Sequence, residues 1–494
     1  QRTMGIWMMQ TVDRAFSDFT THLRAGGIEG LRAGLIGEGA PIPGPFGTKS
    51  LVYADYVASG RALRQVEDFV ADHVLPYYAN SHTEASFCGR YMTYMRQTAR
   101  AEIAHACGAD SRFSTVFCGS GATAGLNRLV HLLGVADAAR SGARPIVFIG
   151  PYEHHSNILP WRESGAEIIT IPEALHGGPD PAQLEMALVT TDPARLRIGA
   201  FSAASNVTGI VTDTDMVTAI LKAHGARAIW DYAGAGPYLP IDMKSGTPHE
   251  KDAVVISAHK FVGGPAASGI MIMRNAAATR TRPVFSGGGT VRFVSPWGHD
   301  YSESLANREE AGTPNVIGDI RAGLAFAVKA AMGQDWLDQR HATLCDRATR
   351  AWRNNPLIEI LGNPDATHRL PIFSLRIRCE RNGDMIHQQL FTRMLSDGYG
   401  IQARGGCACA GPYAHDLLDI DERQSAILRQ QILDGDEIQK PGWTRLNFCA
   451  LTDDAKADFI IRSVDELARD PYRLADHYTC DTRTARFRAR EDMA

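Results

Sequence analysis

Short apolar runs alternate with amphipathic stretches through the middle of the chain. Runs of the length of a buried strand lie at 115–118, 145–149, 167–171, 197–202, 228–231, 253–257 and 269–273. Between them, apolar residues recur with helical spacing at 123–133, 181–189 and 215–224. This alternation predicts βαβ units and a mainly parallel sheet, and therefore an α/β fold.

The pattern changes after about residue 340. A strand, a helix, a second strand and a closing helix are expected at 369–378, 384–395, 443–448 and 453–469. They predict a smaller α+β domain. We therefore expect three parts: an N-terminal arm at 1–50, a large domain at 51–335 and a small domain at 336–494.

Composition narrows the class of protein. The chain has 494 residues, of which 44% are hydrophobic and 21% charged, as in ordinary globular proteins. A net charge of -4 gives no basic excess for binding nucleic acid. The nine cysteines are odd in number in a long chain, which disfavours a disulfide framework and favours a reducing cytoplasm. The sequence has no recognisable secretory signal. It also has no apolar stretch of the roughly 20 residues that a membrane-spanning helix needs.

Polar residues that follow the strands are candidates for chemistry, because parallel sheets bind ligands beyond the carboxyl ends of their strands. Lys260 comes just after the strand at 253–257. A lysine in a partly dry site can lose its proton and form an imine, although a surface lysine opening a loop has the same pattern. Asp231 ends another strand, where a buried carboxylate needs a partner such as the pyridinium nitrogen of pyridoxal 5′-phosphate (PLP). Its alternative role is a helix cap.

Two turns add to these candidates. The glycine turn at 119–123 lies between a strand and a helix, where backbone N–H groups and the Thr123 hydroxyl can hold a phosphate. Such turns are common, and this one lacks the third glycine of a dinucleotide-binding motif. His154 follows the next strand and could stack on a flat cofactor, or belong to a turn capped by Ser156 or Asn157. No set of ligands with metal-binding spacing accompanies it, so we expect no metal.

The order of these residues along the chain resembles a known family. From about residue 53 to residue 459 the sequence is similar to the class V aminotransferase group of fold-type I PLP enzymes, in particular its cysteine desulfurase and selenocysteine lyase branch. The motifs that carry the resemblance are Asn80-Ser81-His82, Gly121-Ala122-Thr123, Glu153-His154-His155-Ser156-Asn157-Ile158, Ser205-Asn206-Val207-Thr208-Gly209, Asp231, Ser257-Ala258-His259-Lys260, Glu310-Ala311-Gly312-Thr313-Pro314 and Arg404-Gly405-Gly406-Cys407-Ala408-Cys409-Ala410.

The resemblance implies a role for each candidate residue. Lys260 would form the Schiff base with PLP and move the α-proton of the substrate. His154 would stack on the ring, Asp231 would pair with its nitrogen, and Asn206 would lie near the ring hydroxyl and the substrate. Arg445 would bind the substrate carboxylate through its guanidinium group. The phosphate would be held by Ala122, Thr123, Ser257 and His259, while Thr313 would reach the phosphate bound in the partner subunit of a homodimer.

Cys409 decides the type of reaction. It occupies the position of the family's sulfur-accepting cysteine, which implies conversion of L-cysteine to L-alanine with a persulfide on Cys409 and transfer of sulfur to an acceptor protein. Without the resemblance, Cys407 and Cys409 could be a redox or metal pair, but the favoured interpretation would be two small residues in a tight glycine loop. The alternatives within PLP chemistry are a C–S lyase, a selenocysteine lyase, or another class V aminotransferase or epimerase; a non-catalytic scaffold would not need Lys260.

The sequence departs from the family at two positions. Gly234 stands where the family usually has glutamine or histidine near the ring hydroxyl, and Cys407 stands where it often has histidine. Cys409 therefore needs another source of positive charge or another base to lose its proton, and Arg404 is a candidate.

Overall fold

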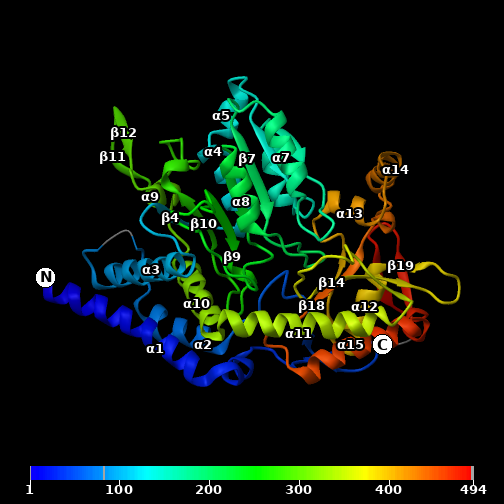
Figure 1. Ribbon diagram of the computed structural model, residues 1–494. Helices are drawn as coiled ribbons and strands as arrows, with labels where there is room; N and C mark the ends of the chain where they lie inside the picture. The colour runs from blue at the N-terminus through cyan, green and yellow to red at the C-terminus, as the bar shows by residue number, and fades with distance from the viewer. Residues whose placement is uncertain (1, 82–83, 491–494) are drawn as a thin grey trace.

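The computed structural model describes residues 2–81 and 84–490, so His82 of the Asn80-Ser81-His82 motif lies outside the described residues. At its centre is a seven-stranded sheet (Figure 1). The strands in spatial order are β4 (Phe113–Phe117), β10 (Gly269–Arg274), β9 (Ala253–Ser257), β8 (Arg227–Asp231), β7 (Arg197–Ser202), β5 (Ile146–Ile149) and β6 (Glu167–Thr170). The pairs from β9 to β6 are parallel, and β10 runs antiparallel to both of its neighbours. The predicted α/β fold with a mainly parallel sheet is confirmed.

Apolar layers cover both faces of this sheet, which explains why its strands are continuous apolar runs. On one face, α4 (Gly121–Leu132) packs on β9 and β10. On the other, α7 (Pro181–Thr190) and α8 (Thr214–Ala223) bury Leu184, Leu188 and Leu221 in the core. Each of these helices lies within a residue or two of the stretch that its spacing predicts. In the described part of the chain, none of the helices is both long and apolar enough to span a membrane.

A second, antiparallel sheet lies in the C-terminal part, with the order β13 (Ile358–Ile360), β14 (Ile372–Arg378), β18 (Trp443–Asn447) and β17 (Arg404–Gly406). The helices α11 (Gln334–Arg353), α12 (Gln388–Tyr399) and α15 (Asp454–Arg469) share its hydrophobic core. The predicted helix at 384–395 was wrong at its start, because β15 (Met385–Ile386) pairs with the end of β14. The helix begins only after His387, whose side chain accepts a hydrogen bond from the N–H of Gln389.

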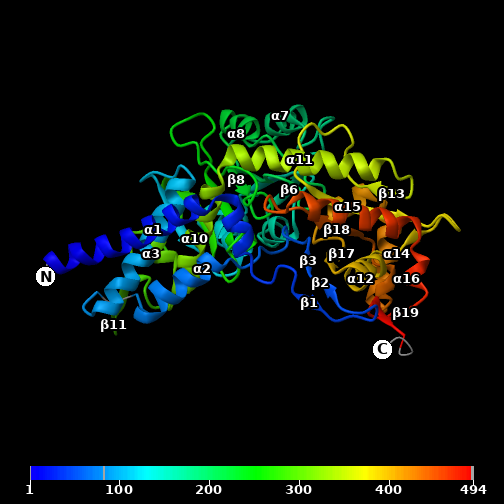
Figure 2. The same cartoon turned by 90° about the horizontal axis from the view of Figure 1, so that it is seen from below.

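Most of the expected N-terminal arm is a helix, α1 (Arg2–Gly34), that kinks at Gly27. Val12, Phe16 and Leu23 are buried in a core shared with α3 (Phe87–Ala106) and α10 (Val316–Met332). Figure 1 shows α1 in blue along the edge of the molecule, beside these helices. The chain then reaches the C-terminal part, where Figure 2 shows the short strand β3 (Val52–Tyr53). This strand pairs with β16 (Ile401–Gln402). This pairing places the segment after β3 beside the loop that follows β16.

Candidate active site

A cavity of about 260 Å³ lies beyond the carboxyl ends of the central strands. Segments far apart in the sequence contribute to its wall. Of the residues to which the resemblance gives a role, those lining it are Ala122, Thr123, His154, Asn206, Asp231, Ser257, His259, Lys260, Cys409 and Arg445. Gly234 and Arg404, singled out where the sequence departs from the family, line it as well. Thr313 does not line the cavity and is exposed on the loop before α10.

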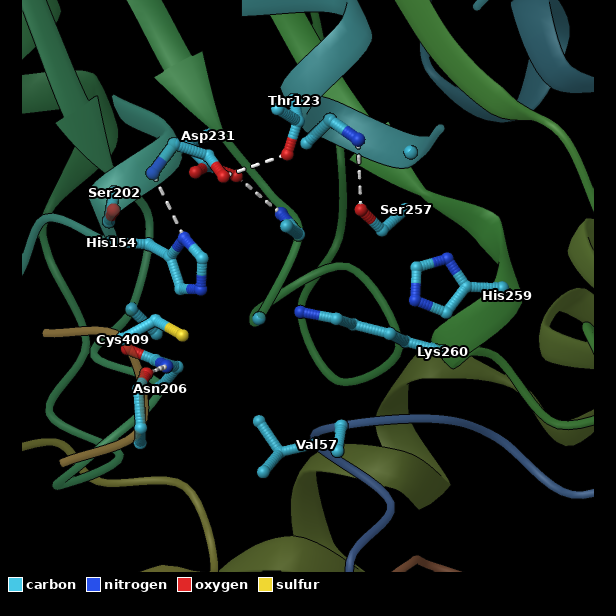
Figure 3. Close-up of a pocket in the computed structure, with 18 of the residues that line it drawn as sticks. Val57, Thr123, His154, Ser202, Asn206, Asp231, Ser257, His259, Lys260 and Cys409 are labelled. Atoms are coloured by element: carbon cyan, nitrogen blue, oxygen red, sulfur yellow. Dashed lines mark hydrogen bonds between the residues drawn. The ribbon is translucent and has the colours of Figure 1, made fainter. Parts of the chain in front are cut away.

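Lys260 is the basic group at the centre of this cavity. It ends a single 3-10 turn, Ala258–Lys260, that follows β9 directly. Figure 3 shows its side chain extended into the cavity, with His154, Asn206 and Cys409 on the opposite side. Burial lowers the pKa of Lys260 to about 8, although the nearby Asp231 carboxylate acts in the opposite direction. A neutral amine, the form that attacks a carbonyl carbon, is therefore accessible close to neutral pH.

Asp231 is a buried carboxylate at the end of β8, only 5% exposed. One of its oxygens accepts a hydrogen bond from the N–H of Ala233 at 2.7 Å. Burial raises the pKa of Asp231, and neither this hydrogen bond nor the charge of Lys260 reverses that shift. The carboxylate thus gains from a further positive partner in the cavity, and a protonated pyridine nitrogen has that chemistry.

His154 supplies a neutral ring to the cavity wall. Its Nδ1 accepts a hydrogen bond from the N–H of Ser156 at 3.1 Å, so the proton of the neutral ring is on Nε2. Burial, followed by the charge of Lys260, lowers the pKa of His154 to about 4. An uncharged flat ring that faces Lys260 across the cavity suits stacking on a planar cofactor (Figure 3).

The glycine turn forms a small polar cradle at the N-terminus of α4. The Ala122 N–H donates to the Ser257 hydroxyl at 3.0 Å, and the hydroxyls of Thr123 and Ser156 are 2.7 Å apart. Gly121 has φ +61°, and a Cβ on it would lie 2.9 Å from the Ser257 hydroxyl oxygen. Only glycine leaves this space open for a ligand, and hydroxyls with a helix N-terminus suit a phosphate. The cradle, Asp231 and Lys260 together fit PLP.

Arg445, in β18, lines the cavity and is buried. One guanidinium nitrogen is 3.0 Å from a carboxylate oxygen of Asp55, and another donates to the backbone carbonyl of Asn206 at 3.2 Å. Asp55 also pairs with the half-exposed Arg404 at 3.0 Å. One carboxylate thus serves two guanidinium groups, which leaves net positive charge for an incoming carboxylate.

Cys409 is presented to the cavity by a sharply turned loop. Ala408 and Cys409 both have left-handed backbone conformations, with φ 53° and 57°. In Figure 3 the sulfur atom of Cys409 points into the cavity. Cys407, by contrast, packs among apolar side chains that include Tyr413 and Trp443. The turn therefore separates the two thiols, and Cys409 is the one exposed to the cavity.

Two residues that hold the site in shape are missing from the sequence-based set. Asp55 lies two residues after the end of β3, so a search for polar residues after strands would have found it if that short strand had been predicted. Glu153 is buried and accepts hydrogen bonds from the Ser202 hydroxyl and the Asn157 side chain, both at 2.7 Å. Burial raises the pKa of Glu153 to about 7. The contacts of Glu153 fix the turn that carries His154 against β7. Its position next to His154 in the sequence is the feature from which its role could have been predicted.

Comparison with known proteins agrees with this geometry. The family model for class-V aminotransferases matches residues 52–429, and the chain belongs to this family. It is 30% identical over 369 residues to a cysteine desulfurase of Enterobacter sp., covering 73% of this chain and 85% of that protein. A probable cysteine desulfurase of Streptomyces coelicolor is 27% identical over 367 residues, covering 73% and 84%.

Solved structures share the fold. The cysteine desulfurase of Thermococcus onnurineus in its apo form superposes with a TM-score of 0.69 at 20% identity, covering 85% of this chain and 94% of that one. A cysteine desulfurase of Escherichia coli gives 0.68 at 21% identity, covering 89% and 98%. The family match and the cysteine desulfurase relatives show that the chain is a cysteine desulfurase-like member of the class V aminotransferases, and the solved structures confirm its fold.

Proposed function

We propose that this protein is a PLP-dependent cysteine desulfurase that converts L-cysteine to L-alanine and leaves a persulfide on Cys409. The observation that carries the proposal is the placement of the Cys409 thiol in the cavity that also contains Lys260 and Asp231. The relatives described as cysteine desulfurases support the same reaction. A C–S lyase would need Lys260 and Asp231 but would have no use for the exposed thiol.

Different residues of the cavity bind the cofactor and the substrate. The glycine cradle with Ser257 and His259 holds the phosphate of PLP, and Asp231 holds its ring nitrogen in the protonated form. When bound, PLP supplies an electron-withdrawing ring that stabilises negative charge on the substrate. Arg445 binds the substrate carboxylate and so orients the amino acid, with Asn206 beside it. The neutral His154 ring covers one face of the cofactor.

Lys260 and Cys409 then act on the substrate from different sides. The neutral amine of Lys260 binds the cofactor and later accepts the α-proton at Nζ, which its lowered pKa makes possible near neutral pH. The Cys409 sulfur attacks the substrate sulfur: an S–S bond forms, the substrate Cβ–S bond breaks, and the electron pair stays with the amino-acid fragment. Protonation of that fragment gives alanine. Overall, L-cysteine and the Cys409 thiol yield L-alanine and the Cys409 persulfide.

The proposal extends to partners and location. Thr313 is exposed and outside the cavity, as expected if it completes the phosphate site of the other subunit in a homodimer. Cys409 is exposed, so that a persulfide on it can be passed to an acceptor protein. Free thiols at all nine cysteines support a reducing compartment such as the cytoplasm.

A product assay tests the proposed reaction. The purified protein is incubated with PLP, L-cysteine and a thiol reductant, and alanine, pyruvate, ammonia and sulfide are quantified. Alanine equal to sulfide is expected, with little pyruvate. Pyruvate and ammonia in equal amounts without alanine would instead identify a C–S lyase and contradict the role of Cys409.

A further inference from the structure

The backbone of the Cys409 loop is held in an unfavourable conformation. Ala408 and Cys409 are consecutive non-glycine residues with left-handed φ values of 53° and 57°. Such conformations are strained and persist only where the surrounding structure fixes them. The contacts that fix this loop therefore decide where the Cys409 sulfur lies.

His155 provides two of these contacts, both to backbone groups on the C-terminal side of the Cys409 Cα. Its backbone N–H donates to the carbonyl oxygen of Cys409 at 2.9 Å, and its Nε2 accepts a hydrogen bond from the N–H of Gly411 at 2.9 Å. The ring lies so close to Gly411 that a Cβ there would be 3.0 Å from Nε2. A third contact comes from the Asn206 amide, which donates to the carbonyl of Ala408 at 3.0 Å.

The ring of His155 must be neutral to accept this hydrogen bond, with its proton on Nδ1. Burial, followed by the positive charge of Arg162, lowers the pKa of His155 and keeps the ring in that form. His155 does not line the catalytic cavity but faces a neighbouring cleft that also contains Asn127 and Glu163. It has no access to the reacting atoms, so its effect on them passes through the loop.

We infer that His155 is a positioning residue that fixes the sulfur-accepting loop relative to the cofactor. His155 is the sequence neighbour of His154, whose ring faces Lys260. One short turn contains both His154, which faces the cofactor site, and His155, which anchors the Cys409 loop. The same turn therefore positions the Cys409 thiol and the cofactor relative to each other. This inference rests on the proposed function for the role of Cys409, whereas the anchoring itself can be measured without turnover.

Two substitutions at His155 separate anchoring from packing. His155→Leu keeps a similar bulk but removes the acceptor, while His155→Gln places an amide oxygen that can accept the Gly411 N–H. The matched control is His105→Leu, which removes an exposed histidine from α3. Hydrogen–deuterium exchange of the peptide containing 407–411 reports the anchoring, and kcat for alanine formation reports its consequence. The visible absorbance of bound PLP and the spectral titration with L-cysteine report cofactor and substrate binding.

The expected result is a kinetic defect without a binding defect. In His155→Leu, exchange within 407–411 becomes faster and kcat falls, each by about 3- to 10-fold, the effect of one neutral hydrogen bond. His155→Gln restores both, and substrate affinity and the PLP absorbance stay unchanged throughout. The inference would be overturned if His155→Leu kept the exchange rate and kcat of the wild type. It would also be overturned if a folded His155→Gln failed to restore these two values. If the wild type forms no alanine while exchange still depends on His155, the proposed function fails and the anchoring stands.

Discussion

Arg445 and Asp55 form a buried ion pair, in which a guanidinium nitrogen lies 3.0 Å from a carboxylate oxygen. The two residues are 390 positions apart in the sequence, so the pair ties the segment after β3 to the C-terminal sheet. Burial lowers the pKa of Arg445 despite Asp55, but an arginine with any such shift stays protonated near neutral pH. The pair therefore holds a charged, oriented guanidinium group in the wall of the cavity.

Removal of the Arg445 guanidinium group should weaken binding of the substrate carboxylate. We expect the double variant Arg445→Met, Asp55→Asn, which avoids a stranded carboxylate, to raise KM for L-cysteine by roughly 10- to 100-fold. Cysteamine lacks the carboxylate, so its binding should change little, and the preference for cysteine over cysteamine should disappear. Spectral titrations with both amines measure this preference. Retention of the preference in the double variant would place the carboxylate site elsewhere.

The lowered pKa of Lys260 predicts how the protein takes up PLP. Because only the neutral amine reacts, the rate at which the bound absorbance appears on adding PLP should rise with pH and level off above a midpoint of about 8. Lys260→Ala should never develop the absorbance. Lys329 is a matched control: burial lowers its pKa to about 8 as well, but its ammonium donates to the carbonyl of Gly236 at 2.7 Å. Lys329→Met should keep the absorbance; a midpoint near that of an ordinary lysine would contradict the assigned environment of Lys260.

We expect Asp231 to strengthen PLP binding but to lower the free energy of unfolding of the protein without PLP. Its pKa is raised by burial, so at neutral pH the ionised carboxylate makes the free energy of unfolding smaller. We expect Asp231→Asn to keep or raise Tm without PLP, while weakening PLP binding at least about tenfold. Asp252, also buried, has a lowered pKa because Lys222 and other donors outweigh burial. Asp252→Asn should therefore lower the free energy of unfolding by about 3 kcal/mol. If Asp231→Asn lowered it by the same amount, Asp231 would be a structural ion-pair residue.

The phosphate cradle can be tested through its glycines. Gly121→Ala places a methyl group 2.9 Å from the Ser257 hydroxyl, so PLP affinity should fall by more than about tenfold. Gly119→Ala is the matched control, since Gly119 also has a positive φ but has open space at its Cβ position. It should share the cost in stability, about 1 kcal/mol, and keep PLP affinity. Equilibrium titration with PLP compares the two; unchanged affinity in a folded Gly121→Ala would mean that the cradle does not contact the phosphate.

The strands were predictable where burial is complete. Positions 197–202 and 253–257 match β7 and β9 residue for residue, because every side chain in these strands is buried and the apolar run ends with the strand. The reversed direction of β10 was not predictable, since an apolar run has the same pattern in either direction. Helix α1 was missed although Val12, Phe16 and Leu23 recur with helical spacing, and the glycines at 26, 27 and 30 interrupt only its C-terminal third.

The candidate site was predictable to the extent that it follows the sheet. Lys260, Asp231 and His154 lie at or just beyond the ends of strands, so the parallel order implied that they meet at one edge of the sheet. The pairing of Asp55 with Arg445 and of His155 with Gly411 was not predictable, because only the folded chain brings these residues near one another. The predicted division at residues 50 and 335 stays a prediction.

The most direct measurement follows sulfur on Cys409. The protein loaded with PLP is mixed with one equivalent of L-cysteine without reductant, alkylated, and digested for mass spectrometry, while alanine is counted in the same sample. The extra sulfur atom should be found on the peptide at Cys409 in an amount equal to alanine. Cys407→Ala should behave like the wild type, since the Cys407 thiol packs away from the cavity, whereas Cys409→Ala should form neither alanine nor persulfide. Full alanine formation by Cys409→Ala, with its PLP absorbance intact, would contradict the proposed desulfurase reaction.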